Sequence, residues 1–208
     1  MFKKNQTLKI VVVSGGLGAM SKTEKLVTTI AEEISKHVTV DLQIVKFSEI
    51  GRFVGQAMYR NELPEQVEAS LQAIENADAL IIGTPVYRAS FSGLFKHFFD
   101  FVEQYALVNV PVFLAATGGS EKHALVIEHQ LRPLFSFFQT YTLPLGIYAT
   151  DKDFNSDYEI NSMELLNRIS LAVSRALPIL QNLSQPLAEI STNNIQKTLV
   201  ASSRVSIL

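Results

Sequence analysis

Residues 8–37, LKIVVVSGGLGAMSKTEKLVTTIAEEISKH, decide the predicted fold class. The first six are apolar and mostly β-branched, apart from Lys9, which is typical of a buried strand. A glycine-rich segment then leads into residues 22–37, where apolar side chains recur at helical spacing on one face. A buried strand, a glycine-rich turn and an amphipathic helix in succession indicate the first unit of an alternating α/β fold.

The same alternation continues to about residue 180. Further strands are predicted at 38–45, 79–82, 110–116 and 143–149, helices at 64–76, 92–105, 121–139 and 161–180, and a loop with room for a short helix at 47–61. This alternation favours a parallel sheet with helices on both faces, and right-handed crossovers restrict its topology. We therefore predict an α/β, flavodoxin-like, doubly wound sheet of five parallel strands in the order 2-1-3-4-5.

The composition is that of one globular domain followed by a polar extension. Of the 208 residues, 47% are hydrophobic and 18% are charged, which excludes wholesale disorder. Residues 184–208 are rich in Ser, Thr, Asn and Gln and show no core-facing pattern. The predicted division is therefore a domain over 1–183 and a C-terminal extension over 184–208.

Charge and residue usage exclude several classes of function. The net charge of −2 offers no basic excess for a nucleic acid, and the absence of cysteine removes disulfides, thiolate nucleophiles and iron–sulfur clusters. The four histidines lack metal-ligand spacing, so no metal site is predicted. Neither a signal peptide nor an apolar stretch of roughly 18 residues is apparent, so we expect a cytoplasmic protein that is not membrane-bound.

Three loops are candidate binding elements, because ligands of this fold bind beyond the carboxyl ends of the strands beside the switch point. The first, Ser14–Thr23, combines glycines, a helix start, the hydroxyls of Ser14, Ser21 and Thr23 and the charge of Lys22, which suits a phosphate. In the second, Thr84–Gly93, Pro85 and Tyr87 stiffen the chain, and Tyr87 and Arg88 could lie beside a flat ring. The third, Thr117–Ser120, could bring backbone N–H groups against ring carbonyls.

The first loop is open to three interpretations. Gly16–Thr23 nearly matches a P-loop, but Ser21 replaces the second glycine and no metal-binding Asp ends a neighbouring strand. It also nearly matches a dinucleotide fingerprint, but the acidic residue expected after the second strand is missing. The third interpretation is a hydroxyl-rich cradle for one terminal phosphate, as on FMN. A capping box formed by Ser21 and Glu24 is compatible with that cradle.

Three segments carry a family resemblance. GTPVYRASFSGLFK at 83–96, AATGGS at 115–120 and the following His123-Ala-Leu resemble the NAD(P)H-dependent FMN reductase family, especially its methanesulfonate-associated, sulfonate-linked branch. The resemblance implies the flavodoxin-like fold and a homodimer or homotetramer. It also implies reduction of FMN by NADH or NADPH, with transfer of reduced flavin to a separate monooxygenase of organosulfur metabolism.

The same resemblance implies the roles of the loop residues. It assigns the FMN phosphate to Ser14, Ser21, Lys22 and Thr23, the isoalloxazine flanks to Pro85, Val86, Tyr87 and Arg88, and the polar ring edge to Thr117, Gly118, Gly119 and Ser120. No catalytic side chain is predicted, because the nicotinamide would pass hydride to flavin N5 while the protein supplies geometry and polarisation. One alternative is a quinone or azo reductase that retains FMN. The other is a flavodoxin-like electron carrier without nicotinamide activity, which the net charge of −2 disfavours because such carriers are usually strongly acidic.

Pro133 interrupts the predicted helix at 121–139. It cannot donate to the carbonyl of His129, and its ring crowds that carbonyl, so a kink or a single π-helical turn is expected. The resemblance to sulfonate-linked reductases implies a π-helical insertion at this place, near a subunit interface. We therefore predict that His129 lies in a π-bulge and contacts a neighbouring subunit.

Overall fold

The computed structural model describes residues 7–183, and the predicted extension at 184–208 lies outside them. The strands are β1 (Leu8–Ser14), β2 (Val40–Lys46), β3 (Ala79–Pro85), β4 (Pro111–Gly118), β5 (Tyr141–Thr142) and β6 (Ile147–Thr150). The α-helices are α1 (Lys22–Ser35), α2 (Phe47–Val54), α3 (Glu65–Glu75), α4 (Gly93–Phe99), α5 (Arg132–Phe137) and α6 (Met163–Leu183). Shorter helical turns are η1 (Arg60–Glu62), η2 (Glu121–His123), η3 (Ile127–Leu131) and η4 (Asp151–Asp153).

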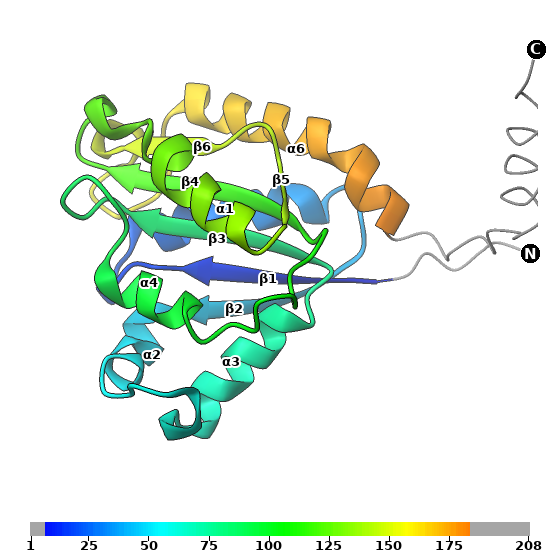
Figure 1. Cartoon of the computed structure of the whole chain (residues 1–208). Helices are drawn as coiled ribbons and strands as arrows, with labels where there is room; N and C mark the ends of the chain where they lie inside the picture. Colours follow the sequence, from blue (N-terminus) through cyan, green and yellow to red (C-terminus); the bar gives the residue numbers. More distant parts are fainter. Residues whose placement is uncertain (1–6, 184–208) are drawn as a thin grey trace, which may run out of the picture.

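The strands form one parallel sheet in the order β2-β1-β3-β4-β5, with β6 also paired to β4. The predicted fold class and strand order are therefore confirmed. In Figure 1 the arrowheads of β1 to β4 all point to the left, so their carboxyl ends meet along one edge of the sheet. The three loops predicted to bind a ligand begin at that edge.

The fifth position of the sheet holds two short strands instead of the single strand predicted at 143–149. β5 pairs with the start of β4 and β6 with its end. Pro144, between them, cannot donate a ladder hydrogen bond. A Cβ on Gly146 would lie only 2.6 Å from Ile127 Cγ2, so this part of the connection is packed against η3 rather than held in the ladder.

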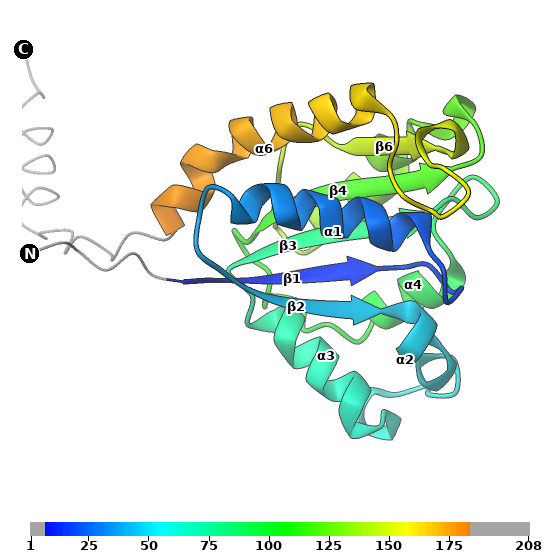
Figure 2. The ribbon, with the colours of Figure 1, turned by 180° about the vertical axis from the view of Figure 1, so that it is seen from behind.

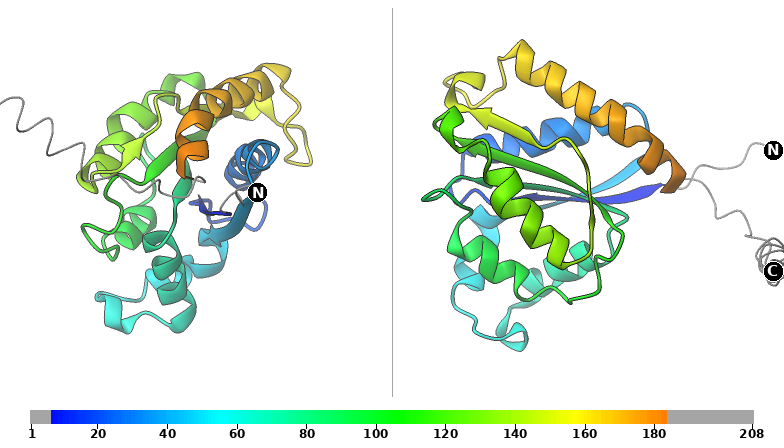
Figure 3. Two further views of the ribbon diagram at one scale, coloured as in Figure 1. Left: turned by 90° about the vertical axis from the view of Figure 1, so that its right-hand side faces the viewer. Right: turned by 45° about the horizontal axis from the view of Figure 1, so that its top comes forward.

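Each face of the sheet covers its own hydrophobic core, as the alternation along β1 illustrates. Ile10 and Val12 pack in a cluster with α1 and α6, whereas Val11 and Val13 pack in a second cluster with α2, α3, α4 and α5. Figures 2 and 3 show α1 and α6 side by side on the first face. The two cores hold the carboxyl edge from both faces.

Most predicted helix boundaries differ by only a few residues, but the helix predicted at 92–105 ends at Phe99. Beyond it, Arg60 Nη1 donates to the carbonyl of Phe101 at 3.1 Å, and the Glu75 carboxylate accepts the N–H of Glu103 at 2.9 Å. These tertiary partners replace the bonds of another helical turn. Within 47–61, predicted as a loop with room for a short helix, α2 forms a helix of two turns.

The helix predicted at 121–139 is broken into η2, η3 and α5. The middle piece, η3, is a π-helix that contains His129, and the N–H of Arg132 reaches back to the carbonyl of Ile127. The prediction of a π-bulge beside Pro133 is therefore confirmed. Contact of the exposed His129 with a neighbouring subunit remains a prediction.

Within residues 7–183, no helix combines the length and apolar character needed to cross a membrane.

Candidate functional site

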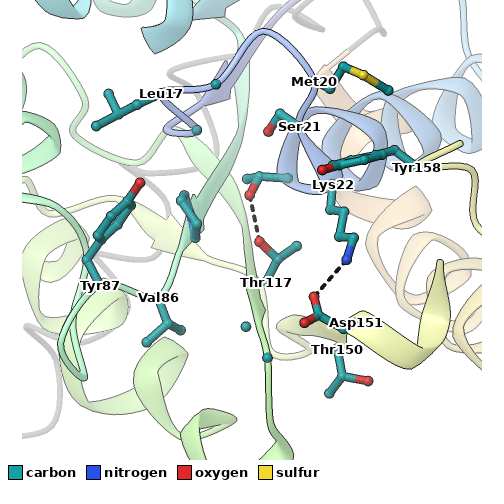
Figure 4. Close-up of a pocket in the computed structure, with 16 residues that line it drawn as sticks. Leu17, Met20, Ser21, Lys22, Val86, Tyr87, Thr117, Thr150, Asp151 and Tyr158 are labelled. Carbon is teal, nitrogen blue, oxygen red and sulfur yellow. Dashed lines mark hydrogen bonds and ion pairs between the residues drawn. The ribbon is translucent and has the colours of Figure 1, made fainter. Parts of the chain in front are cut away.

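A cavity of about 340 Å³ opens at the carboxyl edge of the sheet, where the loops after β1, β3, β4 and β6 converge (Figure 4). Most of the predicted site residues line it: Ser21, Lys22, Thr23, Pro85, Val86, Tyr87, Thr117, Gly118 and Gly119. Three predicted residues, Ser14, Arg88 and Ser120, do not. One cavity thus joins parts of all three predicted loops.

The start of α1 forms the end of the cavity that suits an anion. Ser21 is the N-cap, and its Oγ accepts the N–H of Glu24 at 3.1 Å. The amides of Lys22 and Thr23 have no intrahelical partner, and the helix dipole adds positive potential there. Only half of the predicted capping box forms, because the Glu24 carboxylate pairs with Lys46 at 2.8 Å.

The floor of the cavity is a hydrogen bond between two loops. The hydroxyls of Thr23 and Thr117 lie 2.6 Å apart, and both residues are buried. One hydroxyl donates to the other, which leaves the accepting hydroxyl with a proton to offer. This bond ties the first turn of α1 to the end of β4 and therefore fixes the spacing between the two loops.

The third loop is held by Tyr148 of β6. Its hydroxyl donates to the carbonyl of Ser120 at 2.7 Å, and it lies so close to Gly118 that a Cβ there would be 2.3 Å from it. Burial, together with the charge of Asp151, raises the pKa of Tyr148, so the hydroxyl stays protonated and donates. Glycine at 118 therefore lets the loop pack against Tyr148.

Ser120 and Ser14 have structural positions that differ from the predicted ones. The Ser120 Oγ accepts the N–H of Lys122 at 3.3 Å and caps η2, so it faces the following turn rather than the cavity. Ser14 is only 1% exposed at the end of β1, beneath the first loop. Neither serine offers its side chain to the cavity.

The second loop begins with a tight two-residue turn. Tyr87 and Ser90 exchange backbone hydrogen bonds of 2.7 and 2.9 Å across Arg88 and Ala89, whose φ angles are 46° and 68°. These left-handed conformations are costly for residues other than glycine, and strain of this kind collects at binding sites. Arg88 is exposed at the tip of the turn, which explains why it does not line the cavity.

The turn is anchored on both sides. The N–H of Val86 donates to the carbonyl of Thr117 at 2.8 Å, which joins the second loop to the third. The Ser90 hydroxyl donates to Oε1 of Gln130 in the π-helix at 3.0 Å. Val86 and Tyr87 are thereby held on the side of the cavity opposite Lys22 (Figure 4).

A fourth loop, which the sequence analysis did not single out, completes the site with Thr150, Asp151 and Tyr158. Lys22 Nζ lies 2.8 Å from Asp151 Oδ1 and 5.4 Å from the centre of the Tyr158 ring. The loop follows β6 and could have been found by the rule already used, since β6 also ends at the carboxyl edge of the sheet.

The fourth loop is shaped by Asp153. Its carboxylate accepts the N–H of Thr150 at 2.7 Å and the Thr150 hydroxyl at 3.0 Å. Burial raises the pKa of Asp153, but the hydrogen bonds from Thr150 and Ser162 and the nearby charge of Arg168 outweigh it, so the pKa lies below its usual range. The capped turn presents Asp151 at the mouth of the cavity.

The chain resembles known proteins over most of its length. Residues 8–155 match the family described as NADPH-dependent FMN reductase. The chain is 50% identical over 187 residues to the NADH-dependent FMN reductase SfnF of Pseudomonas fluorescens, covering 90% of this chain and 100% of that one. It is 49% identical over 172 residues to the NADH-dependent FMN reductase SfnE of Pseudomonas putida, covering 83% and 92%.

The fold also resembles a solved structure. An oxidoreductase from Corynebacterium diphtheriae superposes with a TM-score of 0.74 at 30% sequence identity, covering 86% of this chain and 97% of that chain.

Proposed function

Since the chain belongs to the NADPH-dependent FMN reductase family, we propose that the cavity at the carboxyl edge of its sheet binds FMN for reduction by NADH or NADPH. One observation carries this proposal. A single cavity joins a helix N-terminus at one end to a slot between two backbone loops at the other. FMN has the matching shape, with a phosphate and a flat ring at its two ends.

The residues present suit the phosphate. The amides of Lys22 and Thr23 at the start of α1 can donate to its oxygens, and the helix dipole favours its charge. The hydroxyls of Ser21 and Thr23 border the same place. Of the predicted phosphate residues, Ser14 drops out of this proposal because it does not line the cavity.

The other end suits the ring. Val86 and Tyr87 form one side, and the glycines at 118 and 119 let the backbone approach its polar edge. Tyr87 is 44% exposed at the rim, so the cavity stays open to solvent beside it. A nicotinamide can reach the ring through that opening.

Bound FMN supplies the redox chemistry: it takes a hydride from the nicotinamide and a proton from water, giving reduced FMN and the oxidised nucleotide. The protein would hold the two rings together, and the N–H groups of the second and third loops would stabilise the negative charge that develops at the polar edge of the flavin ring. Tyr148, protonated and bonded to Ser120, holds the third loop in place for this task.

Steady-state oxidation of NADH and of NADPH, with FMN, FAD, riboflavin or no flavin, tests the proposal. We expect turnover that requires added FMN, and colourless purified protein. Gly118→Ala, which pushes a Cβ against Tyr148, should lower the rate at limiting FMN roughly tenfold, because small displacements at a binding site cost large factors in rate. Its matched control is Gly93→Ala, where an added Cβ meets open space.

Two results would count against the proposed FMN reductase activity. No turnover with either nucleotide would overturn the proposal. A yellow protein that releases flavin slowly would favour a quinone or azo reductase that retains FMN. Adding Tyr148→Phe to Gly118→Ala removes the crowding oxygen together with its hydrogen bond to Ser120. Flavin binding by the double variant that matches Tyr148→Phe alone would therefore separate local crowding from misfolding.

The partners and the location extend the proposal. We propose that reduced FMN leaves for a separate monooxygenase of organosulfur metabolism, in the cytoplasm where nicotinamide nucleotides are available. The resemblance to the sulfonate-linked branch supports this assignment. Product formation by a sulfonate monooxygenase, given its sulfonate and oxygen and with this protein, FMN and NADH as the only source of reduced flavin, tests it.

We also propose a homodimer or homotetramer. Phe137 on α5 is 61% exposed beside a largely apolar groove between α4 and α5, a surface that suits a second copy of the chain. His129 lies in the π-helix that leads into α5 and would contact that copy. Light scattering of the purified protein measures the assembly.

A further inference from the structure

We propose that Asp151 sets the affinity of the cavity for the phosphate of FMN by competing with that phosphate for the ammonium group of Lys22. The inference rests on the proposed function, because it concerns FMN in this cavity. It assigns a role to a residue of the fourth loop, which the three predicted loops do not include. The structure supports it in four steps.

The first step is the position of Lys22. As the first residue of α1, it offers its backbone amide to the anion end of the cavity. Its side chain, however, extends along one side of the cavity to Asp151, as Figure 4 shows. The ammonium group also lies within 6 Å of two ring centres, at 5.4 Å from Tyr158 and 5.9 Å from Phe154, where cation–π attraction applies.

The second step is the charge around the start of α1. The ammonium groups of Lys25 and Lys46 are also paired, with Glu159 at 2.5 Å and Glu24 at 2.8 Å. Each of these three lysines therefore carries a carboxylate partner. An arriving phosphate is attracted by the helix N-terminus, but it must compete for Lys22 and meets the negative charge of Asp151.

The third step is that Asp151 is held in place. Thr150 and Asp153 fold the backbone into the capped turn η4, and Phe154 is buried in the core beside it. The ion pair of Lys25 with Glu159 fastens the far side of the loop to α1. The carboxylate is thus presented by a fixed turn, and its competition with a phosphate is a built-in feature of the site.

The fourth step is the exposure of the pair. The Asp151 side chain is 64% exposed, whereas that of Lys22 is 27% exposed. An ion pair this accessible is weak, so the carboxylate can return to water when a phosphate takes the lysine. Because the phosphate is the same in oxidised and reduced FMN, the competition weakens the binding of both forms. It therefore favours the exchange of flavin between turnovers.

Flavin binding without any nicotinamide tests the inference. Dissociation constants for FMN and for riboflavin, which lacks the phosphate, are measured by flavin fluorescence for the unchanged protein, Asp151→Asn and Asp157→Asn. The last is the matched control, an exposed aspartate of the same loop whose backbone N–H bonds to Asn155. At low salt, Asp151→Asn should tighten FMN by roughly threefold to tenfold and leave riboflavin unchanged.

Two further arms make the test specific. The gain for FMN should shrink as salt rises beyond about 0.15 M, where charges are screened within about 8 Å. It should also shrink in a Lys22→Gln background, where no ammonium group remains to be competed for. Asp157→Asn should behave like the unchanged protein in every arm.

Other results would overturn the inference. An equal change for FMN and riboflavin would mean that Asp151 acts on the ring or the ribityl chain. Weaker FMN binding with a lowered melting temperature would mean that its role is to hold the loop. If the unchanged protein bound neither flavin, the proposed function itself would fail, which is a distinct result.

Discussion

Thr23 and Thr117 are 94 positions apart in the chain, yet their hydroxyls share a buried hydrogen bond at the floor of the site. The sequence predicted that both residues belong to the site, because both lie in loops at the carboxyl edge. It could not predict their pairing, because nothing in either loop indicates which side chains face one another. The same limit explains Ser14, which has the right residue type in the right loop but is buried.

Thr117→Val should destabilise the protein by about 1–3 kcal/mol, because it leaves the buried hydroxyl of Thr23 without its partner. Urea unfolding measures the loss. Thr23→Val combined with Thr117→Val should cost less than the sum of the two single changes, since no unpaired hydroxyl remains. Strictly additive losses would contradict this account.

Among the elements, the π-helix and the split fifth strand show what a single proline can and cannot reveal. Pro133 has no N–H for the helical ladder, so a local defect near His129 could be predicted and is present. Pro144 likewise has no N–H to donate within a strand, but the apolar character of residues 143–149 favoured the prediction of one continuous strand. The break became evident only where Gly146 packs against Ile127 of the π-helix.

The turn after β6 has a predictable dependence on pH. The lowered pKa of Asp153 means that its carboxylate stabilises the folded state at pH values above the ordinary pKa of the group. This contribution is lost as pH falls through the lower, folded-state pKa. Asp153→Asn should therefore lower the free energy of unfolding at neutral pH by about 1 kcal/mol, a modest value because the group is partly exposed.

Urea unfolding of Asp153→Asn at several pH values checks the sign. The difference from the unchanged protein should shrink as pH falls below about 4. Asp157→Asn, on the same loop, provides the control and should show no such trend. A difference that grows in acid would contradict the assignment of Asp153 as the carboxylate that holds this turn.

For the whole molecule, topology was the most predictable property, because buried β-branched runs alternating with amphipathic helices leave few arrangements. The order β2-β1-β3-β4-β5 follows, and with it the edge where the site lies. The fourth loop was not singled out because only the strands beside the switch point were searched. Asp151 and Tyr158 are therefore the main site residues that reasoning from the sequence missed.

The proposed domain boundary is a prediction at this scale. The described residues 7–183 supply a hydrophobic cluster on each face of the sheet and a cavity at its carboxyl edge. A chain ending at Leu183 should keep its affinity for FMN within about twofold and its melting temperature within a few degrees. Fluorescence titration and thermal unfolding of the shortened and the full chain decide it. A large loss of either would place residues 184–208 in the domain.

The bond between Thr23 and Thr117 has a consequence for the kind of flavin the cavity accepts. It joins the first turn of α1 to the end of β4, so the part of the cavity proposed for the phosphate and the part proposed for the ring stay at a fixed separation. That separation limits the length of the polyol that can connect a phosphate to a ring. Under the proposed function, we therefore expect a flavin phosphate with a polyol one carbon shorter to bind more weakly than FMN, because it could not place its phosphate at the start of α1 and its ring between the second and third loops at once.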